Sequence, residues 1–581
     1  MINRILAKIF YDTAGFLEAL EVAFKPFAYR RAAMAIESLE EDAADIYKQS
    51  GIKGLEGIPG VGESIAQKIE EYILTGKIAY HDELKKKLPV DLSGLTSVQG
   101  VGPRRARILY RELQVKNLKD LERAAKEHKI AALAGFGQKS EENILQGIEF
   151  RKGSLGRFLL GDILPLAQEV RRGLLGLEEV QAVEIGGSLR RRKETIGDVD
   201  FLAIAKPSSG PKGVARIMEY FTGLPGVEKI WGSGATKSSV RMKEGVNMDI
   251  RVLPPESYGA ALQYFTGSKE HNVALRRLAQ EKGLKLSEYG LFSGDRAVAG
   301  RTEKEIYEYL GMELIVPEMR EDTGEIAAAL SGKLPEIIGY GDLKGDLHCH
   351  SAWDGGDNSI EEIVAAAKKK GYSYIGIADH TKFLKIENGL DEAALEKRNG
   401  HIDKLNHLLE KEGGDFRVLK GCEANIMADG SIDIDNRALA QLDFVIAGVH
   451  SSFGLNKDQM TRRIIRAMEN PNVDIISHPT GRLLNRRGEY QADFAAICEA
   501  AWRTGTVLEI NSHPDRLDLN DLHIRYAKEH GVKMVIDTDA HNVGHLRFAE
   551  FGIAQARRGW AEAGDVINTF AVGKFLDSLK N

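Results

Sequence analysis

Cysteine and long apolar segments are both scarce in this sequence. Its three cysteines (Cys349, Cys422 and Cys498) form no CxxC pair, which is typical of a protein from a reducing cytoplasm. No apolar run approaches the length of a membrane span, and residues 1–20 predict an amphipathic helix without the apolar segment of a secretory signal. Low-complexity segments are also lacking. We therefore expect a cytoplasmic protein with no membrane partner.

The charges and the histidines divide the chain into two unlike parts. At 581 residues, with 43% hydrophobic and 28% charged residues, the chain is globular in composition but too long for one hydrophobic core. The net charge of −6 is uneven, because residues 1–341 hold 49 basic and 48 acidic side chains, whereas residues 342–581 hold 30 and 37. The second part also holds 12 of the 15 histidines. We infer two chemically different halves joined near residues 318–341.

Three glycine-containing turns interrupt the helical periodicity of residues 1–150. They read LEGIPGVGESIAQKI, LTSVQGVGPRRARIL and LAGFGQKSEENIL, and a predicted helix follows each turn. Glycine lets the backbone approach a ligand, and the free N–H groups of a helix start bind anions. A tight turn without a ligand is the alternative for any single copy. The repetition resembles the helix-hairpin-helix motif, which binds DNA phosphates without reading the base sequence.

Opposite charges lie side by side in IGGSLRRRKETIGDVDF, residues 185–201. Asp198 and Asp200 are two residues apart on a predicted strand, so both side chains face one side, and they repel each other unless a divalent cation is bound. Asp249 in VNMDIRVL lies on another predicted strand. Three such carboxylates suit two Mg²⁺ or Mn²⁺ ions about 3.5–4 Å apart, while the Gly-Gly-Ser turn and the arginines would hold a triphosphate. Two surface aspartates on an edge strand are the alternative for an isolated DxD.

The complete string resembles the nucleotidyltransferase fold, and two further segments narrow the resemblance to the family X DNA polymerases. These segments are YFTGSKEHNVALRRLA (264–279) and GLKLSEYGLF (283–292), which are similar to the family's thumb. The resemblance implies an aromatic wall that excludes a 2′-hydroxyl from the sugar site. One departure is Arg192, where the family usually has glycine after its paired arginines. The resemblance implies catalytic metal ligands at Asp198, Asp200 and Asp249, triphosphate contacts at Gly187, Ser188, Arg191 and Gly197, sugar and base contacts at Tyr264, Phe265 and Gly267, and a minor-groove contact at Asn272.

The first hairpin also resembles the family's N-terminal small domain. Lys68 lies where some members use a Schiff-base lysine to remove 5′-deoxyribose phosphate, a reaction that needs a lowered lysine pKa. A helix lysine that contacts phosphate is the alternative. Tyr29 in PFAYRRAA is expected on the same DNA-facing surface. The expected DNA-binding residues are Gly60, Gly62, Gly100, Gly102, Arg104 and Tyr29.

Metal-ligating residues follow short apolar segments throughout the second half. YIGIADH, VLKGCEANI, DFVIAGVHSSF, VDIISHP, TVLEINS and KMVIDTDAH alternate with helical segments, which is typical of an α/β barrel whose chemistry lies at the strand ends. Nine nitrogen and oxygen ligands without a thiolate pattern favour two or three Mn²⁺, Zn²⁺ or Fe²⁺ ions over separate solvated histidines. The nine are His348, His350, Asp354, His380, Glu423, His450, His478, Asp539 and His541.

This set resembles the PHP (polymerase and histidinol phosphatase) domain, a distorted barrel of metal-dependent phosphoesterases. The family has Ser-Asp-Gly after its His-x-His strand, and this chain shifts the carboxylate to Asp354, with Asp357 as the other candidate. Arg482 and Lys382 are candidates for phosphate binding. Cys349 and Cys422 flank predicted ligands but should point to the opposite face of their strands.

Together the resemblances predict a multidomain DNA repair polymerase. The fold class is helical helix-hairpin-helix N-terminal domains, an α+β palm and thumb, and a C-terminal TIM-like PHP barrel. The predicted function is short-gap filling with dNTPs on gapped or nicked DNA and metal-dependent 3′–5′ exonuclease or 3′-end processing, by a monomer. The alternatives are a phosphatase of a small ester such as histidinol phosphate, and a non-catalytic DNA-binding scaffold. The predicted domains are residues 1–88 and 89–150 (helix-hairpin-helix), 151–257 (palm), 258–318 (thumb), 319–341 (linker) and 342–581 (PHP).

Overall fold

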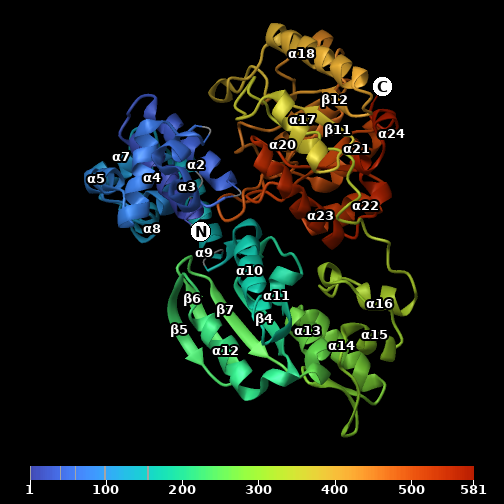
Figure 1. The fold of residues 1–581 in the computed structure, drawn as a ribbon. Coiled ribbons are helices and arrows are strands. Elements are labelled where there is room, and N and C mark those ends of the chain that lie inside the picture. The colour runs from blue at the N-terminus through green and yellow to red at the C-terminus, as the bar shows by residue number, and fades with distance from the viewer. Residues whose placement is uncertain are drawn as a thin grey trace.

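The computed structural model describes residues 2–39, 41–58, 60–96, 98, 100–153 and 156–580. Figure 1 shows a helical region in blue, a sheet region in green and an α/β barrel from yellow to red. The predicted fold class is confirmed. None of the described helices is both long and apolar enough to cross a membrane.

The N-terminal region consists of helices around one core. The amphipathic faces of α1 and α2 bury Leu6, Phe10 and Ile36 completely. Within the glycine turns, Gly60, Gly100 and Gly135 have φ values of +79°, +87° and +81°, a left-handed conformation that favours glycine. The helices are α1 (Asn3–Ala19), α2 (Lys25–Ser38), α3 (Ala43–Glu56), α4 (Glu63–Thr75), α5 (Ala79–Lys87), α6 (Leu92–Thr96), α7 (Pro103–Leu113), α8 (Leu118–Lys126) and α9 (Gln138–Gly153).

A five-stranded sheet in the order β2-β4-β7-β6-β5 lies below the helical region and the barrel in Figure 1, and we call it the palm sheet. Its β4 and β7 are parallel, and Phe201 and Ile250 bury one face against α10 and α12. The alternation of side chains therefore leaves the predicted aspartates on the other face. The elements are β1 (Phe158–Leu159), α10 (Leu160–Leu175), β2 (Val180–Ile185), α11 (Gly187–Arg190), β3 (Thr195–Ile196), β4 (Asp198–Ala205), α12 (Gly210–Thr222), β5 (Val227–Ser233), β6 (Lys237–Met242) and β7 (Asn247–Val252).

The next region packs helices on a three-stranded antiparallel sheet, β10-β9-β8. Its core includes Leu275, Leu291 and Tyr307, and also Trp560 from the barrel. The elements are α13 (Tyr258–Thr266), α14 (Lys269–Glu281), β8 (Lys285–Ser287), β9 (Gly290–Ser293), β10 (Arg296–Ala299), α15 (Glu303–Tyr309) and α16 (Glu325–Leu330).

Parallel strands form the C-terminal barrel. Strands β11 and β12 pair with each other, and the other five strands form a sheet in the order β13-β14-β15-β16-β17. Cys349 bridges both Ile377 at the end of β11 and Ala540 beyond β17, so the segment around it closes the ring. The strands are β11 (Tyr374–Ile377), β12 (Arg417–Lys420), β13 (Glu423–Asn425), β14 (Ile446–Gly448), β15 (Ile475–Ile476), β16 (Val507–Asn511) and β17 (Met534–Asp537). The helices are α17 (Ile360–Lys369), α18 (Glu392–Lys411), α19 (Asn436–Leu439), α20 (Lys457–Met468), α21 (Phe494–Thr504), α22 (Asp521–Glu529), α23 (Ala549–Arg558) and α24 (Val572–Leu576).

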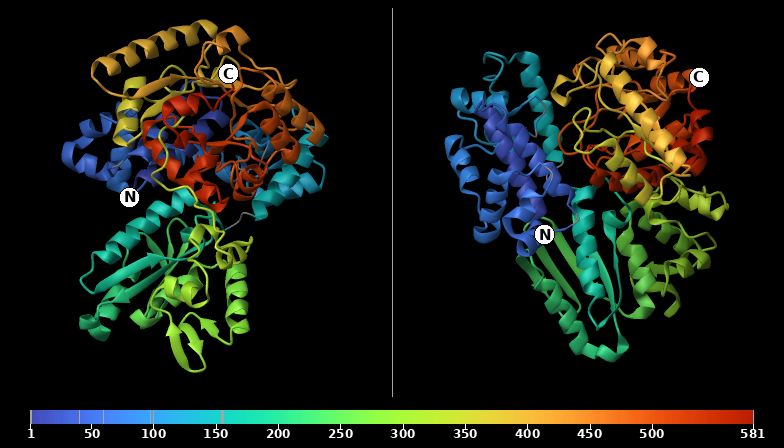
Figure 2. Two further views of the ribbon diagram at one scale, coloured as in Figure 1. Left: turned by 90° about the vertical axis from the view of Figure 1, so that its right-hand side faces the viewer. Right: turned by 45° about the horizontal axis from the view of Figure 1, so that its top comes forward.

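The barrel contacts both the palm sheet and the N-terminal helices. Leu484, Leu517 and Phe551 of the barrel belong to the hydrophobic core of the palm sheet. The N-terminal helices lie beside the barrel in Figures 1 and 2. Lys139 Nζ of α9 donates to the Gly454 carbonyl of the barrel at 3.2 Å. The palm sheet and the barrel are therefore packed together through apolar side chains as well as polar contacts.

Candidate active sites of the palm sheet and the barrel

The three predicted palm aspartates share one end of the sheet. Asp200 on β4 and Asp249 on β7 are register partners, and Asp198 lies two residues before Asp200. Burial and the neighbouring Asp198 and Asp249 carboxylates raise the pKa of Asp200 to about 6. Lys237 Nζ, at 3.5 Å from Asp249 Oδ2, is a nearby cation from β6. A divalent-cation site requires this concentration of negative charge. The negative charge also explains why the sequence places basic side chains next to these aspartates.

The Gly-Gly-Ser turn lies directly against this site, in a segment that we call the nucleotide loop (residues 186–194). The Gly186 N–H donates to the Asp200 carbonyl at 2.8 Å. Gly187 has φ +65°, and a Cβ there would lie 3.4 Å from Asp200 Oδ2. The turn therefore brings the start of α11 and its Ser188 next to the carboxylates. Arg192 has φ +55°, a left-handed conformation at the position where the family usually has glycine.

The predicted nucleotide contacts occupy the same region, but several are engaged within the protein. Arg191 Nε donates to Glu321 at 3.0 Å, and its guanidinium also donates to the Thr266 carbonyl. Asn272 is only 9% exposed and donates to the Tyr264 carbonyl at 2.7 Å. The half-buried rings of Tyr264 and Phe265 meet edge to face at 5.2 Å between centroids. Gly197 lies immediately before β4, and Gly267 follows α13 with φ +71°.

The N-terminal candidates differ in exposure. Lys68 Nζ donates to the Ser64 carbonyl at 2.9 Å and lies over the Tyr80 ring, and burial lowers the pKa of Lys68, in the direction that Schiff-base chemistry requires. Gly62 and Gly102 directly precede α4 and α7, and Arg104 is exposed. Tyr29 is only 6% exposed and stacks on Tyr80. The prediction that Tyr29 lines the DNA-facing surface is wrong, because its helix turns that ring into the core of the N-terminal region.

The barrel brings all nine predicted ligands to one site. They come from the carboxyl ends of successive strands, as the sequence indicates, because parallel strands meet at one edge of the barrel. Groups whose ligand atoms all lie within 4.8 Å of one another are His350/His380/His541, His348/His350/Asp539, His380/Glu423/His450 and His350/Asp354/Asp379.

Glu423 lies at the centre of this cluster. Its Oε2 is 3.3 Å from His348 Nε2 and 2.8 Å from His380 Nδ1. Its Oε1 is 3.2 Å from His450 Nε2 and 3.1 Å from His478 Nε2. Although burial by itself raises the pKa of Glu423, the adjacent imidazoles hold it well below its ordinary value. The carboxylate therefore stays ionised and faces two sides of the cluster at once.

Outer partners orient the imidazoles, and the sequence analysis missed them. Glu509 at 0% exposure lies 2.6 Å from His348 Nδ1, and Asn425 Oδ1 lies 2.7 Å from His450 Nδ1. Such contacts fix which ring nitrogen faces the cluster. Their signal was present in the sequence, since Glu509 lies in the quoted strand TVLEINS. Asp379, directly before His380, was missed as a candidate ligand.

Unpaired nitrogens indicate that the cluster fits metal ions. Among the residues that the structure describes, the buried atoms His348 Nε2, His350 Nε2, His380 Nδ1 and His478 Nδ1 make no hydrogen bond of suitable geometry, although Glu423 Oε2 lies within 3.8 Å of the first three. Buried polar atoms are normally satisfied, so several such nitrogens in one acidic cluster fit coordination to cations. The donor set, which is imidazole and carboxylate with no thiolate, matches Mn²⁺, Zn²⁺ or Fe²⁺.

The structure decides between the two candidate carboxylates of the early loop. Asp354 Oδ2 lies 2.8 Å from His350 Nδ1 and accepts a bond from the His380 N–H at 2.7 Å. Asp357 instead faces Arg31 of the N-terminal region at 3.7 Å. Asp354 is therefore the member of the cluster.

Both predicted phosphate-binding cations point elsewhere. Arg482 is buried, and its guanidinium contacts Glu194 of the nucleotide loop at 2.5 Å and the Leu517 carbonyl. Lys382 is exposed and pairs with Glu392 at 2.6 Å. A different cation, Arg516, borders the cluster at 3.4 Å from Asp539 Oδ2. Cys349 and Cys422 lie in the hydrophobic core of the barrel.

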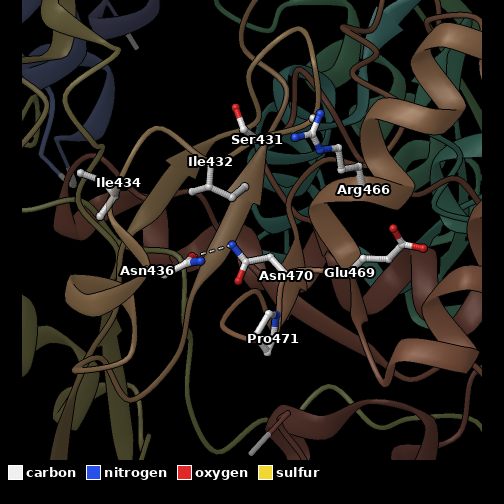
Figure 3. A pocket seen from close by; sticks show the side chains of 9 residues that line it. Ser431, Ile432, Ile434, Asn436, Arg466, Glu469, Asn470 and Pro471 are labelled. Carbon is white, nitrogen blue, oxygen red and sulfur yellow. Dashed lines mark hydrogen bonds between the residues drawn. The ribbon is translucent and has the colours of Figure 1, made fainter.

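A cavity of about 380 Å³ lies away from both sites. Figure 3 shows Asn436 and Asn470 hydrogen-bonded across it, with Arg466 and Glu469 of the α20 end beside them. Its lining residues include none of the predicted ligands, so we assign it no part in the chemistry.

Four family models match the chain. They are a helix-hairpin-helix domain at residues 1–78, a SAM-like helix-hairpin-helix tandem at 92–149, the DNA polymerase beta thumb at 261–321 and the PHP domain at 346–513. These matches agree with the helical region, the α13–β10 region and the barrel of the structure.

Relatives among known proteins extend the match to nearly the whole chain. The "DNA polymerase/3′-5′ exonuclease PolX" of Bacillus subtilis is 38% identical over 94% of this chain and 93% of its own length. The DNA polymerase lambda of Arabidopsis thaliana is 28% identical over 55% of this chain and 62% of its own length. A probable phosphatase of Thermoanaerobacter sp. is 32% identical over 40% of this chain and 94% of its own length. The chain therefore belongs to the bacterial family X DNA polymerases that carry a C-terminal PHP domain.

Proposed function

We propose that this chain is a DNA polymerase that fills short gaps during DNA repair and processes 3′ ends through its PHP barrel by 3′–5′ exonuclease activity. The observation that carries the proposal is the presence of two separate acidic sites in one chain, the palm aspartates and the barrel cluster. Membership of the family supports it, as does the B. subtilis relative whose name gives both activities. Gapped or nicked DNA, dNTPs, a monomeric state and a cytoplasmic location are parts of this proposal.

In the palm, Asp198, Asp200 and Asp249 would hold two Mg²⁺ or Mn²⁺ ions. Bound divalent ions would stabilise the charge that develops on phosphoryl oxygens, and at the barrel ligands they would also activate a water molecule. The chain's own contribution is placement. Gly187 has no side chain, so the nucleotide loop can bring a triphosphate next to Asp200.

The half-buried rings of Tyr264 and Phe265 would pack on the sugar and base of the nucleotide and exclude a 2′-hydroxyl. Arg251 lies over the Phe265 ring at 4.6 Å, which holds the ring in place. Selection of deoxynucleotides would therefore depend on a supported aromatic wall.

In the barrel, the nine predicted ligands would hold two or three Mn²⁺, Zn²⁺ or Fe²⁺ ions. Glu509 and Asn425 keep His348 and His450 with their Nε2 atoms toward Glu423. The site is buried apart from the more exposed His450 and His541, so the end of a DNA strand would enter on their side.

The test is primer extension on gapped DNA by the Asp198→Ala, Asp200→Ala double variant. We expect nucleotide addition to be abolished while binding to gapped DNA persists, because removal of both carboxylates removes the groups that hold the ions. Undiminished extension would refute the assignment of this strand. A phosphatase of a small ester such as histidinol phosphate is the second candidate, which the similarity of the barrel to probable phosphatases favours. It is distinguished by release of phosphate from that ester without activity on DNA.

A further inference from the structure

Two buried arginines of the barrel contact the nucleotide loop of the palm. Arg558, the last residue of α23, is 5% exposed and donates from Nη1 to the Arg191 carbonyl at 2.9 Å. Arg482 is 7% exposed and contacts Glu194, the last residue of the loop. The barrel thus holds the loop at two points, 367 and 288 residues away along the chain.

A half-buried carboxylate, Glu321, connects the two regions at the first point. Glu321 Oε1 accepts from Arg558 Nη1 at 2.9 Å and from Arg191 Nε at 3.0 Å. Arg558 also pairs with Asp521 of α22. Burial by itself raises the pKa of Glu321, but Arg558, Arg191 and Lys193 hold it below its ordinary value. Arg558 therefore has two acidic partners that fix its guanidinium in place, and it can hold the Arg191 peptide rigidly.

The backbone of the loop needs such support. Arg192, directly after the contacted carbonyl, has φ +55°. A left-handed conformation is unfavourable for a non-glycine residue and persists where the surrounding contacts impose it. Arg558 contacts the carbonyl of the peptide that joins Arg191 to Arg192, so it restrains the backbone immediately before the left-handed residue.

We infer that Arg558 is a positioning residue for nucleotide addition, since it holds the nucleotide loop, whose Gly187 lies next to the Asp200 carboxylate. Arg482 supports the same loop through Glu194. The inference rests on the proposed nucleotide-binding function of the loop. It gives the barrel a part in polymerisation that is separate from its own chemistry.

The test is single-nucleotide insertion by the full chain on gapped DNA, with KM for the dNTP and kcat measured separately. For Arg558→Gln we expect KM to rise roughly tenfold with kcat changed by less than about threefold, because the loop binds the nucleotide while the palm aspartates remain in place. Arg558→Lys, which keeps the charge but loses the planar fork, should give an intermediate KM. Arg503→Gln is the matched control, because Arg503 is exposed and pairs with Glu469 on the barrel surface, and its KM should equal that of the parent.

A second variant separates positioning from general damage. Glycine adopts a left-handed backbone at little cost, so Arg192→Gly added to Arg558→Gln should recover at least half of the lost affinity. Degradation of a 5′-labelled strand with Mn²⁺ and no dNTP should stay within about twofold of the parent in every variant. The inference is overturned if folded Arg558→Gln or Arg558→Lys has the parent KM, if glycine restores nothing, or if degradation falls in parallel with insertion.

The Asp198→Ala, Asp200→Ala double variant in the same assay keeps the two proposals apart. If it inserts nucleotides normally, the proposed function of the palm fails. If it is inactive while Arg558→Gln matches the parent, only the positioning role of Arg558 fails.

Discussion

The palm aspartates should cost stability when no metal is present, and Asp200→Asn measures that cost. Burial and two neighbouring carboxylates raise the pKa of Asp200 from 3.8 to about 6. A difference of this size corresponds to about 3 kcal/mol, and partial exposure of the side chain reduces it to roughly 1–2 kcal/mol. In a metal-free buffer at pH 7.5, Asp200→Asn should therefore unfold with a free energy roughly 1–2 kcal/mol higher than the parent.

The pH dependence gives the sign of the effect. Because the folded-state pKa is raised, the folded protein binds more protons than the unfolded chain between pH 3.8 and about 6, and stability falls as the pH rises through this window. The cost is fully present above pH 6 and absent below pH 3.8. The advantage of Asp200→Asn should accordingly shrink to less than about 0.5 kcal/mol at pH 4.

The assay is urea unfolding of the full chain, with and without chelator, followed by addition of Mg²⁺. Mg²⁺ should stabilise the parent and have less effect on Asp200→Asn, since a ligand stabilises only the state that binds it. Asp295→Asn at an exposed turn is the control and should change stability by less than about 0.5 kcal/mol. An equal gain at both pH values, or none at pH 7.5, would refute the crowding of charge at this site.

Three further predictions concern the other sites. Glu423→Ala should lower Mn²⁺-dependent degradation of a 5′-labelled strand by roughly 10²-fold or more, because Glu423 faces four imidazoles. His348→Ala should lower it by less, because His348 is one ligand. Nucleotide addition should survive in both variants. Gly60→Val and Gly100→Val should weaken binding to gapped DNA of any sequence, because φ near +80° disfavours a branched side chain. If the hairpin amides bind phosphates as we propose, binding by the parent should also weaken with rising salt, and binding that is indifferent to salt would contradict this. Lys68→Ala should abolish borohydride trapping of a 5′-deoxyribose phosphate end if Lys68 is the Schiff-base lysine, and unchanged trapping would exclude it.

The barrel cluster could be predicted from the sequence because each ligand follows its own apolar segment. Parallel strands carry residues at their ends to one edge, so local pattern was enough to place His450 and His478 together. The choice between Asp354 and Asp357 was different. Both lie in one loop, and only the fold shows that Asp354 contacts His350 while Asp357 turns toward Arg31.

The prediction for Tyr29 failed for a comparable reason. PFAYRRAA is amphipathic, but the residue letters do not say which face meets α1, and the ring packs edge to face on Phe10. The prediction that Arg482 binds phosphate failed because an arginine close to a predicted metal ligand can equally form an ion pair between domains. Its partner Glu194 lies 288 residues earlier, beyond any local pattern.

The uneven distribution of charge and histidine predicted two chemically different halves, and the palm aspartates and the barrel cluster do lie in different halves of the sequence. The packing does not divide in this way. Leu484, Leu517 and Phe551 of the barrel are all less than 10% exposed within the palm core, and exposing a side chain of this kind costs about 1.5–3 kcal/mol. A polymerase half cut free at residues 319–341 would lose this packing together with the contacts of Arg558 and Arg482. Reduced insertion by such a fragment would therefore reflect lost support of the nucleotide loop as much as lost barrel chemistry, and single substitutions in the full chain are what separate the two.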